Sequence, residues 1–208
     1  MPAPLLLILW LALVLALAVL VRRRWPQQRE ASRKLVHIGA GGLVPLAAAL
    51  HVPLAQALPT ALVVTVLTAI NHRLRLIPAV EDVGRRSLGT VAYGASISLL
   101  LLLFWRQRPE LVVAGVLVMA LGDGMAGLVG PLLPSPRWQL WGQTKSLLGT
   151  LTMAVLAVLV LRLSLPGLAW PPLLATALAA TALEQISWGG LDNLTVPIAS
   201  AWLAGQLG

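Results

Sequence analysis

The sequence predicts an all-α integral membrane protein, a polytopic bundle of seven or eight transmembrane helices. Hydrophobic residues make up 58% of the 208 residues and charged residues only 11%, whereas about a quarter of a soluble domain is charged. A bilayer core tolerates apolar side chains and rejects charge, so the shortage of charge favours a membrane protein. The apolar runs are continuous rather than alternating, which excludes the strands of an outer-membrane barrel.

Eight apolar runs approach the length of about 20 residues that a helix needs to cross a bilayer. The last run is short and the second is interrupted by glycines and Pro45, so we expect seven or eight spans. We treat residues 1–208 as one transmembrane domain, with an N-terminal span and its basic flank at 1–30 and a core at 31–200. The runs lie near residues 4–21, 35–51, 54–70, 88–105, 111–131, 147–165, 168–186 and 194–207.

The basic residues predict the orientation of the bundle. Twelve of the 15 lysines and arginines fall in residues 22–34, 71–87 and 132–146, which share one side of the membrane if the N-terminus lies outside. Basic connections stay cytoplasmic, so we expect an outside N-terminus, in a plasma or thylakoid-type membrane. Arg22, Arg23 and Arg24 follow the first apolar run, whereas a cleaved signal carries its charge before that run. The net charge of +8 therefore points to the lipid bilayer, not nucleic acid, as the partner.

The acidic residues predict that polar chemistry gathers at the cytoplasmic end. Six of the seven acids fall at or toward that end, and only Glu110 is on the far side. This asymmetry suits an enzyme that joins a water-soluble reactant to a lipid. The alternative class is a transporter or a structural membrane protein, but a transporter would line a path through the membrane with polar groups, and the outer half is nearly without them. The six are Glu30, Glu81, Asp82, Asp123, Glu184 and Asp192.

The segment LGDGMAGLVG, residues 121–130, places a carboxylate inside an apolar run. An acid at membrane depth is costly unless it is paired or hydrated, so Asp123 is a functional candidate, as a ligand of Mg²⁺. We expect Gly122, Gly124 and Gly127 to let the helix unwind, so that the backbone approaches a phosphate. Close packing between helices is the alternative, and it explains the glycines but not the acid.

Two further segments supply cations near this acid. In TKSLLGT, Lys145, Ser146 and Gly149 begin a span and suit a phosphate seat, although a snorkelling lysine with a serine cap explains them equally well. In SRKLVHIGAGG, Arg33 and His37 share a helix face, so Arg33 is a candidate phosphate clamp with His37 one turn deeper. The alternative is a basic flank that orients the first span, with a hydrogen-bonded histidine.

The segment LDNLTVPIAS begins the last run with Asp192 and Asn193. A helix cap explains one of these residues, and a metal- or sugar-binding pair explains both. Glu184, about two turns earlier, either joins them or snorkels to the surface. In EDVGRRSLGT, residues 81–90, a solvated loop with salt bridges is the simpler interpretation.

Together these segments resemble the CTP-dependent polyprenol kinases of membranes, and within them the phytol kinases. The resemblance implies transfer of the terminal phosphate of CTP to an isoprenoid alcohol, with phytol or geranylgeraniol expected and Mg²⁺ as cofactor. The matching pieces are SRKLVHIGAGG, GRRSLGTVAYGASISLLLLLFW, PELVVAGVLVMALGDGMAGLVG, TKSLLGTLTM and LDNLTVP, in the order of the family across most of residues 31–200.

The resemblance implies a nucleotide site formed by Asp123, Gly124, Ala126, Gly130, Lys145 and Ser146. From the residues themselves we expect Asp123 and Asp192 to hold metal, Asn193 and Glu184 to contact substrate, and Asp123, Lys145 and His37 to be catalytic. Asp123, Asp192 and His37 each remain candidates for the base. The expected nucleotide site comprises Arg33, Lys34, Gly122, Gly124, Ala126, Gly127, Gly130, Lys145, Ser146 and Gly149.

The chain departs from the family pattern at two positions. Leu148 stands where the family has a glutamate, and Pro134 stands where a glycine is expected. Asp192 and Glu184 are the carboxylates that could compensate for the missing one. Two alternatives stay open, a CDP-lipid synthase similar to phosphatidate cytidylyltransferases and a relative that binds without turnover.

Overall fold

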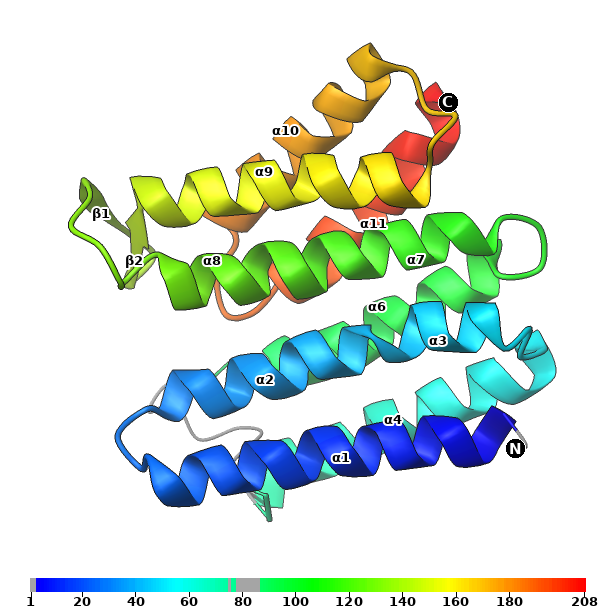
Figure 1. Ribbon diagram of the computed structural model, residues 1–208, viewed down its shortest axis with the longest axis horizontal. Coiled ribbons are helices and arrows are strands. Elements are labelled where there is room, and N and C mark those ends of the chain that lie inside the picture. Colours follow the sequence, from blue (N-terminus) through cyan, green and yellow to red (C-terminus); the bar gives the residue numbers. More distant parts are fainter. Residues whose placement is uncertain (1–2, 75, 78–86) are drawn as a thin grey trace.

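The computed structural model describes residues 3–74, 76–77 and 87–208, and this part of the chain is almost entirely helical (Figure 1). The predicted all-α fold is therefore correct except for one small β-hairpin. Glu81, Asp82, Arg85 and Arg86, the residues of the expected salt-bridged loop, lie outside the described residues, as does Arg75. The helices are α1 (Ala3–Arg24), α2 (Arg29–Gly41), α3 (Leu43–Ala49), α4 (Leu54–Leu74), α6 (Gly89–Phe104), α7 (Pro109–Leu117), η1 (Val118–Asp123), α8 (Gly124–Val129), α9 (Leu147–Ser164), α10 (Trp170–Ile186) and α11 (Asp192–Leu207).

A continuous helix formed by α7, η1 and α8 lies at the centre of the bundle. Pro109 begins it at a position where a missing N–H costs nothing. Its segments pack against α2, α3, α6, α9 and α11, whereas α1 contacts mainly α2 and α3. The side chains of Leu111, Val112, Val116 and Met119 are fully buried as a result. Asp123 is thus carried on the most enclosed helix of the fold.

Among the described residues, four helices are long and apolar enough to cross a membrane: α1, α4, the composite helix Pro109–Val129, and α9. α6 is apolar but shorter. The expected second span is divided into α2 and α3, which meet at Gly42. The count of seven or eight spans stays a prediction.

The β-hairpin connects α8 to α9. Strands β1 (Arg137–Leu140) and β2 (Gln143–Ser146) pair antiparallel, with Trp138 opposite Lys145. Trp141 and Gly142 form the two-residue turn, and both have positive φ, the mark of a type I′ turn.

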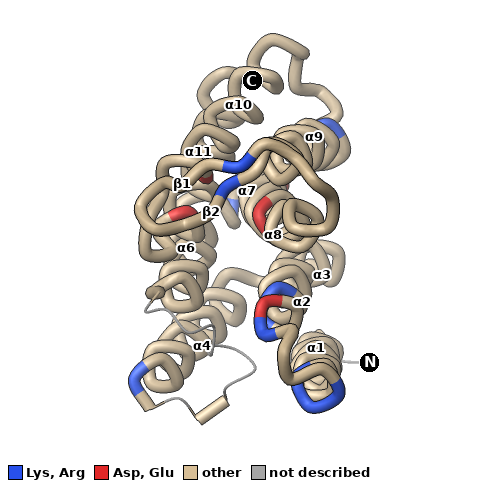
Figure 2. The backbone as a smooth tube through the Cα atoms, turned by 90° about the vertical axis from the view of Figure 1, so that its left-hand side faces the viewer, with Lys and Arg blue, Asp and Glu red and all other residues tan. Residues whose placement is uncertain are grey.

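The hairpin, the start of α2 and the end of α1 all lie at one end of the bundle, which we call the basic end (Figure 1). Arg22, Arg23 and Arg24 close α1 there. Viewed from this end, the hairpin lies in front of α8 and α11 (Figure 2). That the basic end faces the cytoplasm stays a prediction.

The close contact between α7 and α11 gives a test of the packing. A side chain at Gly115 would run into the backbone of Pro197 and the side chain of Ala201. Gly115→Leu should therefore lower the free energy of unfolding by about 3 kcal/mol or more, measured by thermal denaturation in detergent. Gly167→Leu is the matched control, because Gly167 faces open space. Equal stability of the two variants would contradict this packing.

Candidate active site

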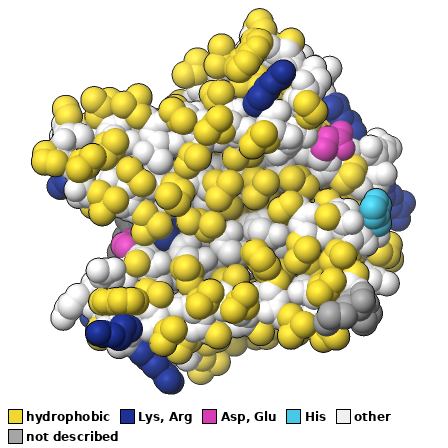
Figure 3. Space-filling view, in the orientation of Figure 1, with side chains coloured by type: hydrophobic (Ala, Val, Ile, Leu, Met, Phe, Trp, Pro, Cys, Tyr) yellow, Lys and Arg dark blue, Asp and Glu magenta, His cyan; other side chains and the backbone are white. Residues whose placement is uncertain are grey.

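A cavity of about 400 Å³ opens at the basic end of the bundle. Its walls come from α2, α8, the hairpin, the start of α9, the end of α10 and the start of α11, so segments far apart in sequence meet there. In Figure 3 the molecule is hollowed at this end, below the face formed by α8 and α9. Among the residues singled out from the sequence, the lining includes Arg33, Lys34, Asp123, Ala126, Gly127, Gly130, Lys145, Ser146, Gly149, Glu184, Asp192 and Asn193.

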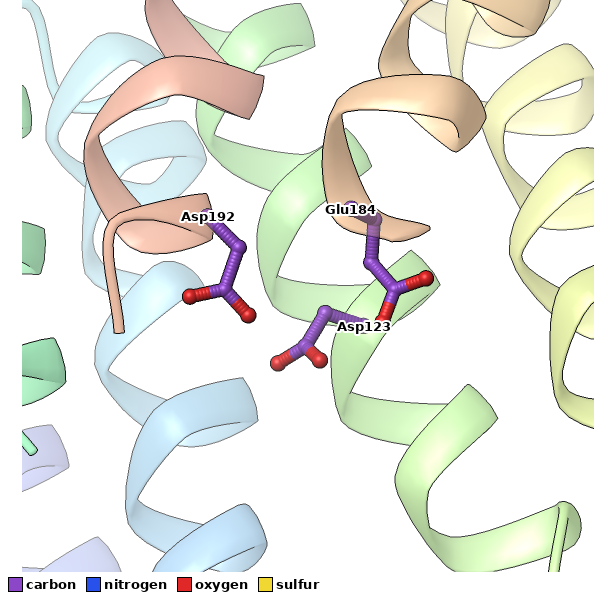
Figure 4. A group of neighbouring side chains, drawn as sticks. All are labelled: Asp123, Glu184 and Asp192. Atoms are coloured by element: carbon purple, nitrogen blue, oxygen red, sulfur yellow. The ribbon is translucent and has the colours of Figure 1, made fainter. Parts of the chain in front are cut away.

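Three carboxylates from different helices converge in this cavity. Asp123 ends η1, Glu184 lies near the end of α10, and Asp192 begins α11. Figure 4 shows their side chains pointing toward one another, and one oxygen of each lies within 4.8 Å of the others. Carboxylate oxygens are ligands that Mg²⁺ takes in proteins, usually from one or two side chains together with water and substrate phosphates. The sequence predicted Asp123 and Asp192 as metal ligands, and the structure brings Glu184 close to both of them.

Asn193 lines the cavity next to Asp192, and its Nδ2 donates a hydrogen bond of 3.4 Å to Asp192 Oδ1. Its side chain is buried, and Oδ1 has no hydrogen-bond partner among the described residues. A buried amide oxygen without a partner costs free energy unless something else satisfies it.

Two lysines neutralise two of the three acids. Lys34 Nζ donates to Asp123 Oδ2 at 2.6 Å and to the Asp123 carbonyl at 3.0 Å. Lys145 Nζ donates to Glu184 Oε1, and to the Glu184 carbonyl at 2.9 Å. Lys34 was expected to bind nucleotide, but its ammonium is buried against Asp123. Asp192 forms no ion pair with any described residue.

Asp192 therefore has a different environment from the other two acids. It precedes the apolar run that starts at Leu194, and its Oδ1 accepts a hydrogen bond of 3.1 Å from the Asn193 N–H. Burial, followed by the negative charge of Asp123, raises the pKa of Asp192 to about 6. A cation at the cavity would favour the ionised form of this carboxyl group.

The positive and negative charges on the described side chains of the cavity are equal in number. Four are basic and four acidic, and Arg33 is further paired with Glu30 at 2.9 Å. A nucleoside triphosphate carries several negative charges, so these residues alone lack the positive excess to hold it. A divalent cation on the three carboxylates would supply that excess, which is a second reason why the residues fit a metal.

The backbone around Asp123 differs from the expectation. We expected the glycines to unwind the helix, and this is wrong, because the chain stays helical with a π-helical stretch over Val118–Asp123. π-Helical turns recur at functional sites. Gly122 faces Met153, Gly124 faces Ile38, and Gly127 faces Lys34. Close packing accounts for these glycines, and only Gly127 of the three lines the cavity.

His37 does not line the cavity, unlike Asp123 and Asp192. Its Nε2 lies 3.5 Å from Asp123 Oδ2 and 3.3 Å from the Met119 carbonyl, and its ring stacks on Tyr93. His37 is thus placed to orient Asp123, and the two aspartates are the candidate bases that reach the cavity.

Lys145 and Ser146 lie on β2 rather than on a span. The Ser146 hydroxyl caps α9 by accepting a hydrogen bond of 3.1 Å from the Gly149 N–H. The structural alternative for this serine is therefore correct. Arg137, Gln143 and Thr144 were not among the predicted site residues, but they also line the cavity. The alternation of polar and apolar residues in RWQL, followed by a glycine at 142, was a local signal of the hairpin that carries them.

The buried pair between Lys34 and Asp123 predicts a strong dependence of stability on both partners. Lys34→Met should lower the free energy of unfolding by about 3–5 kcal/mol, because it leaves a buried carboxylate without its cation. Adding Asp123→Asn to Lys34→Met should restore most of that stability. Thermal denaturation in detergent measures both variants. If the double variant is as unstable as Lys34→Met, the pair does not explain the effect.

Comparison with known proteins identifies the family. The chain is 38% identical over 217 aligned residues to the phytol kinase of Synechocystis sp., and the alignment covers 97% of this chain and 93% of the relative. No family profile and no solved structure matches the chain. Identity at this level over nearly the whole of both proteins agrees with the resemblance found in the motifs. The chain belongs to the phytol kinase family.

Proposed function

We propose that this chain transfers the terminal phosphate of CTP to the hydroxyl group of an isoprenoid alcohol, phytol or geranylgeraniol, at the cytoplasmic face of the membrane. The observation that carries the proposal is one cavity at the basic end in which three carboxylates and several cations meet. The relative named a phytol kinase supports the reaction class and the alcohol. The CTP donor rests on the motif resemblance.

The side chains suit the electrostatic demands of phosphoryl transfer. Catalysis of this reaction consists mainly of positioning and of neutralising charge on the phosphates. Lys145, Arg137 and Arg33 line the cavity and are the candidate phosphate contacts. Mg²⁺, when bound by the three carboxylates, would neutralise further charge on the transferred group.

The alcohol hydroxyl needs a proton acceptor in the cavity. Asp192 lines the cavity and lacks an ion-pair partner among the described residues, whereas Asp123 is occupied by Lys34. We therefore assign Asp192 as the base. The alcohol arrives laterally from the bilayer, with its tail between the helices. Ala126 and Gly127 offer small side chains on one wall for this approach.

The glutamate that this chain lacks at Leu148 has a substitute in the cavity. Leu148 does not line it, but Glu184 reaches it from α10 and pairs with Lys145. This carboxylate beside the lysine favours an active enzyme over a relative that binds without turnover.

Purified protein in lipid vesicles with CTP, Mg²⁺ and phytol should yield phytyl phosphate and CDP. Asp192→Asn should lower kcat by about 100-fold or more, since it removes the proposed base and one carboxylate of the proposed metal site, while thermal stability is retained. Glu110→Gln is the matched control, because Glu110 pairs with Arg108 at the opposite end and should leave kcat unchanged. Product analysis by mass spectrometry measures both outcomes.

Two results would overturn the proposal. Release of pyrophosphate with a CDP-lipid product would indicate a cytidylyltransferase. Absence of turnover across CTP, ATP, GTP and UTP with phytol, geranylgeraniol, farnesol and a long polyprenol would indicate a relative that does not catalyse the reaction.

A further inference from the structure

The tip of the β-hairpin carries an exposed tryptophan in an unfavourable backbone conformation. Trp141 has φ of 52° and Gly142 has φ of 71°, and the Trp141 side chain is 67% exposed. A bulky L-residue rarely adopts positive φ, because its Cβ crowds the following carbonyl. Trp141 is therefore held where neither backbone preference nor burial in this chain favours a tryptophan.

The turn type favours residues other than tryptophan at position 141. Type I′ turns favour Asn-Gly, Asp-Gly or Gly-Gly, since these residues accept positive φ at both central positions. Gly142 meets this preference and Trp141 does not. Asparagine at position 141 would suit the backbone of this turn better than tryptophan. The turn conformation therefore does not explain why the residue is tryptophan. Strain of this kind in a well-defined element indicates a function outside local stability.

Other large apolar side chains near the hairpin are exposed in the same way. Leu132 and Leu133 precede the hairpin and are 72% and 60% exposed, and Trp138 on β1 is partly exposed. Figure 3 shows hydrophobic side chains continuing from the face of α9 onto this end of the molecule. Trp25 and Trp188, also exposed, lie in the α1–α2 and α10–α11 connections at the same end.

The position of the hairpin indicates that the partner of Trp141 is the lipid bilayer. Trp141 is six residues before Leu147, the first residue of the apolar helix α9, so it lies within about 20 Å of that helix even if the chain is fully extended. The hairpin stays close to the ends of α8 and α9 (Figure 1). Tryptophan concentrates at the boundary between lipid and water, where its ring meets acyl chains and its N–H meets headgroups.

We propose that Trp141 inserts into the headgroup region of the bilayer, so that the β1–β2 hairpin is a membrane-interface anchor. Leu132, Leu133 and Trp138 widen the apolar contact with lipid. This interaction surface is independent of the proposed kinase activity. Lys145 pairs with Trp138 in the hairpin, so an anchored hairpin would also hold Lys145 in place at the cavity. This consequence alone rests on the proposed function.

The chain has no cysteine, so a single cysteine gives a direct test. Trp141→Cys is spin-labelled and reconstituted in vesicles, and its collision rates with oxygen and with a nickel chelate present on both sides of the membrane are measured. Labels at Gln107, in an exposed turn at the opposite end, and at Val155, on the exposed face of α9, provide the water and lipid references. The ratio of oxygen to nickel collisions at 141 should fall between the two references.

Two outcomes of this measurement would overturn the proposal. A ratio at 141 equal to that at Gln107 would show a tip that projects into water. Spin–spin broadening between labels at 141 would show that a second copy of the chain covers the tip instead of lipid.

Trp141→Asn keeps the proposal testable without a label. It should leave the thermal stability in detergent unchanged or raise it, because asparagine accepts the turn, and it should reduce the quenching of tryptophan fluorescence by phospholipids brominated near the headgroup. A loss of stability in detergent would show that Trp141 serves the fold of the protein, and unchanged quenching would show that it does not contact lipid.

Discussion

The arrangement of the site depends on the pairing of the buried Asp123 carboxylate with the Lys34 ammonium group. A carboxylate inside an apolar bundle is unfavourable unless a cation and hydrogen bonds compensate for lost hydration. Lys34 provides both the cation and a hydrogen bond, with its Nζ 2.6 Å from Asp123 Oδ2, and so fixes α2 against the central helix. This close approach explains why positions 124 and 127 are glycine, since side chains there would meet Ile38 and Lys34.

A second pair of the same kind organises the opposite wall of the cavity. Lys145 on β2 pairs with Glu184 on α10 and so fixes the hairpin to the helix that precedes Asp192. The two lysines hold two acids close to a third without the repulsion that three unpaired carboxylates would create. The result is a compact, nearly neutral cluster that suits a cation and a polyanion bound together. In the proposed reaction, this cluster brings the phosphate donor to the level at which a lipid alcohol presents its hydroxyl group.

The sequence predicted the helical bundle, the polar end, and the meeting of Arg33, Asp123, Lys145 and Asp192 at that end. The reason is that charged side chains are excluded from apolar spans and therefore collect at the ends of the bundle. The sequence did not predict that Lys34 pairs with Asp123, since the two residues are 89 positions apart and their helix faces depend on packing. The glycines were ambiguous for a physical reason, because both phosphate approach and tight helix packing require a missing side chain.

Metal binding tests the account of the site most directly. Mn²⁺ is titrated into purified protein with CTP present, and the bound ion is followed by electron paramagnetic resonance, with Mg²⁺ as competitor and protein-free CTP as reference. We predict saturable binding by the protein that Mg²⁺ displaces and that Glu184→Gln weakens about tenfold or more, while Glu110→Gln leaves it unchanged. Equal binding by the wild-type protein and Glu184→Gln, or binding no stronger than that of free CTP, would contradict a metal site formed by Asp123, Glu184 and Asp192.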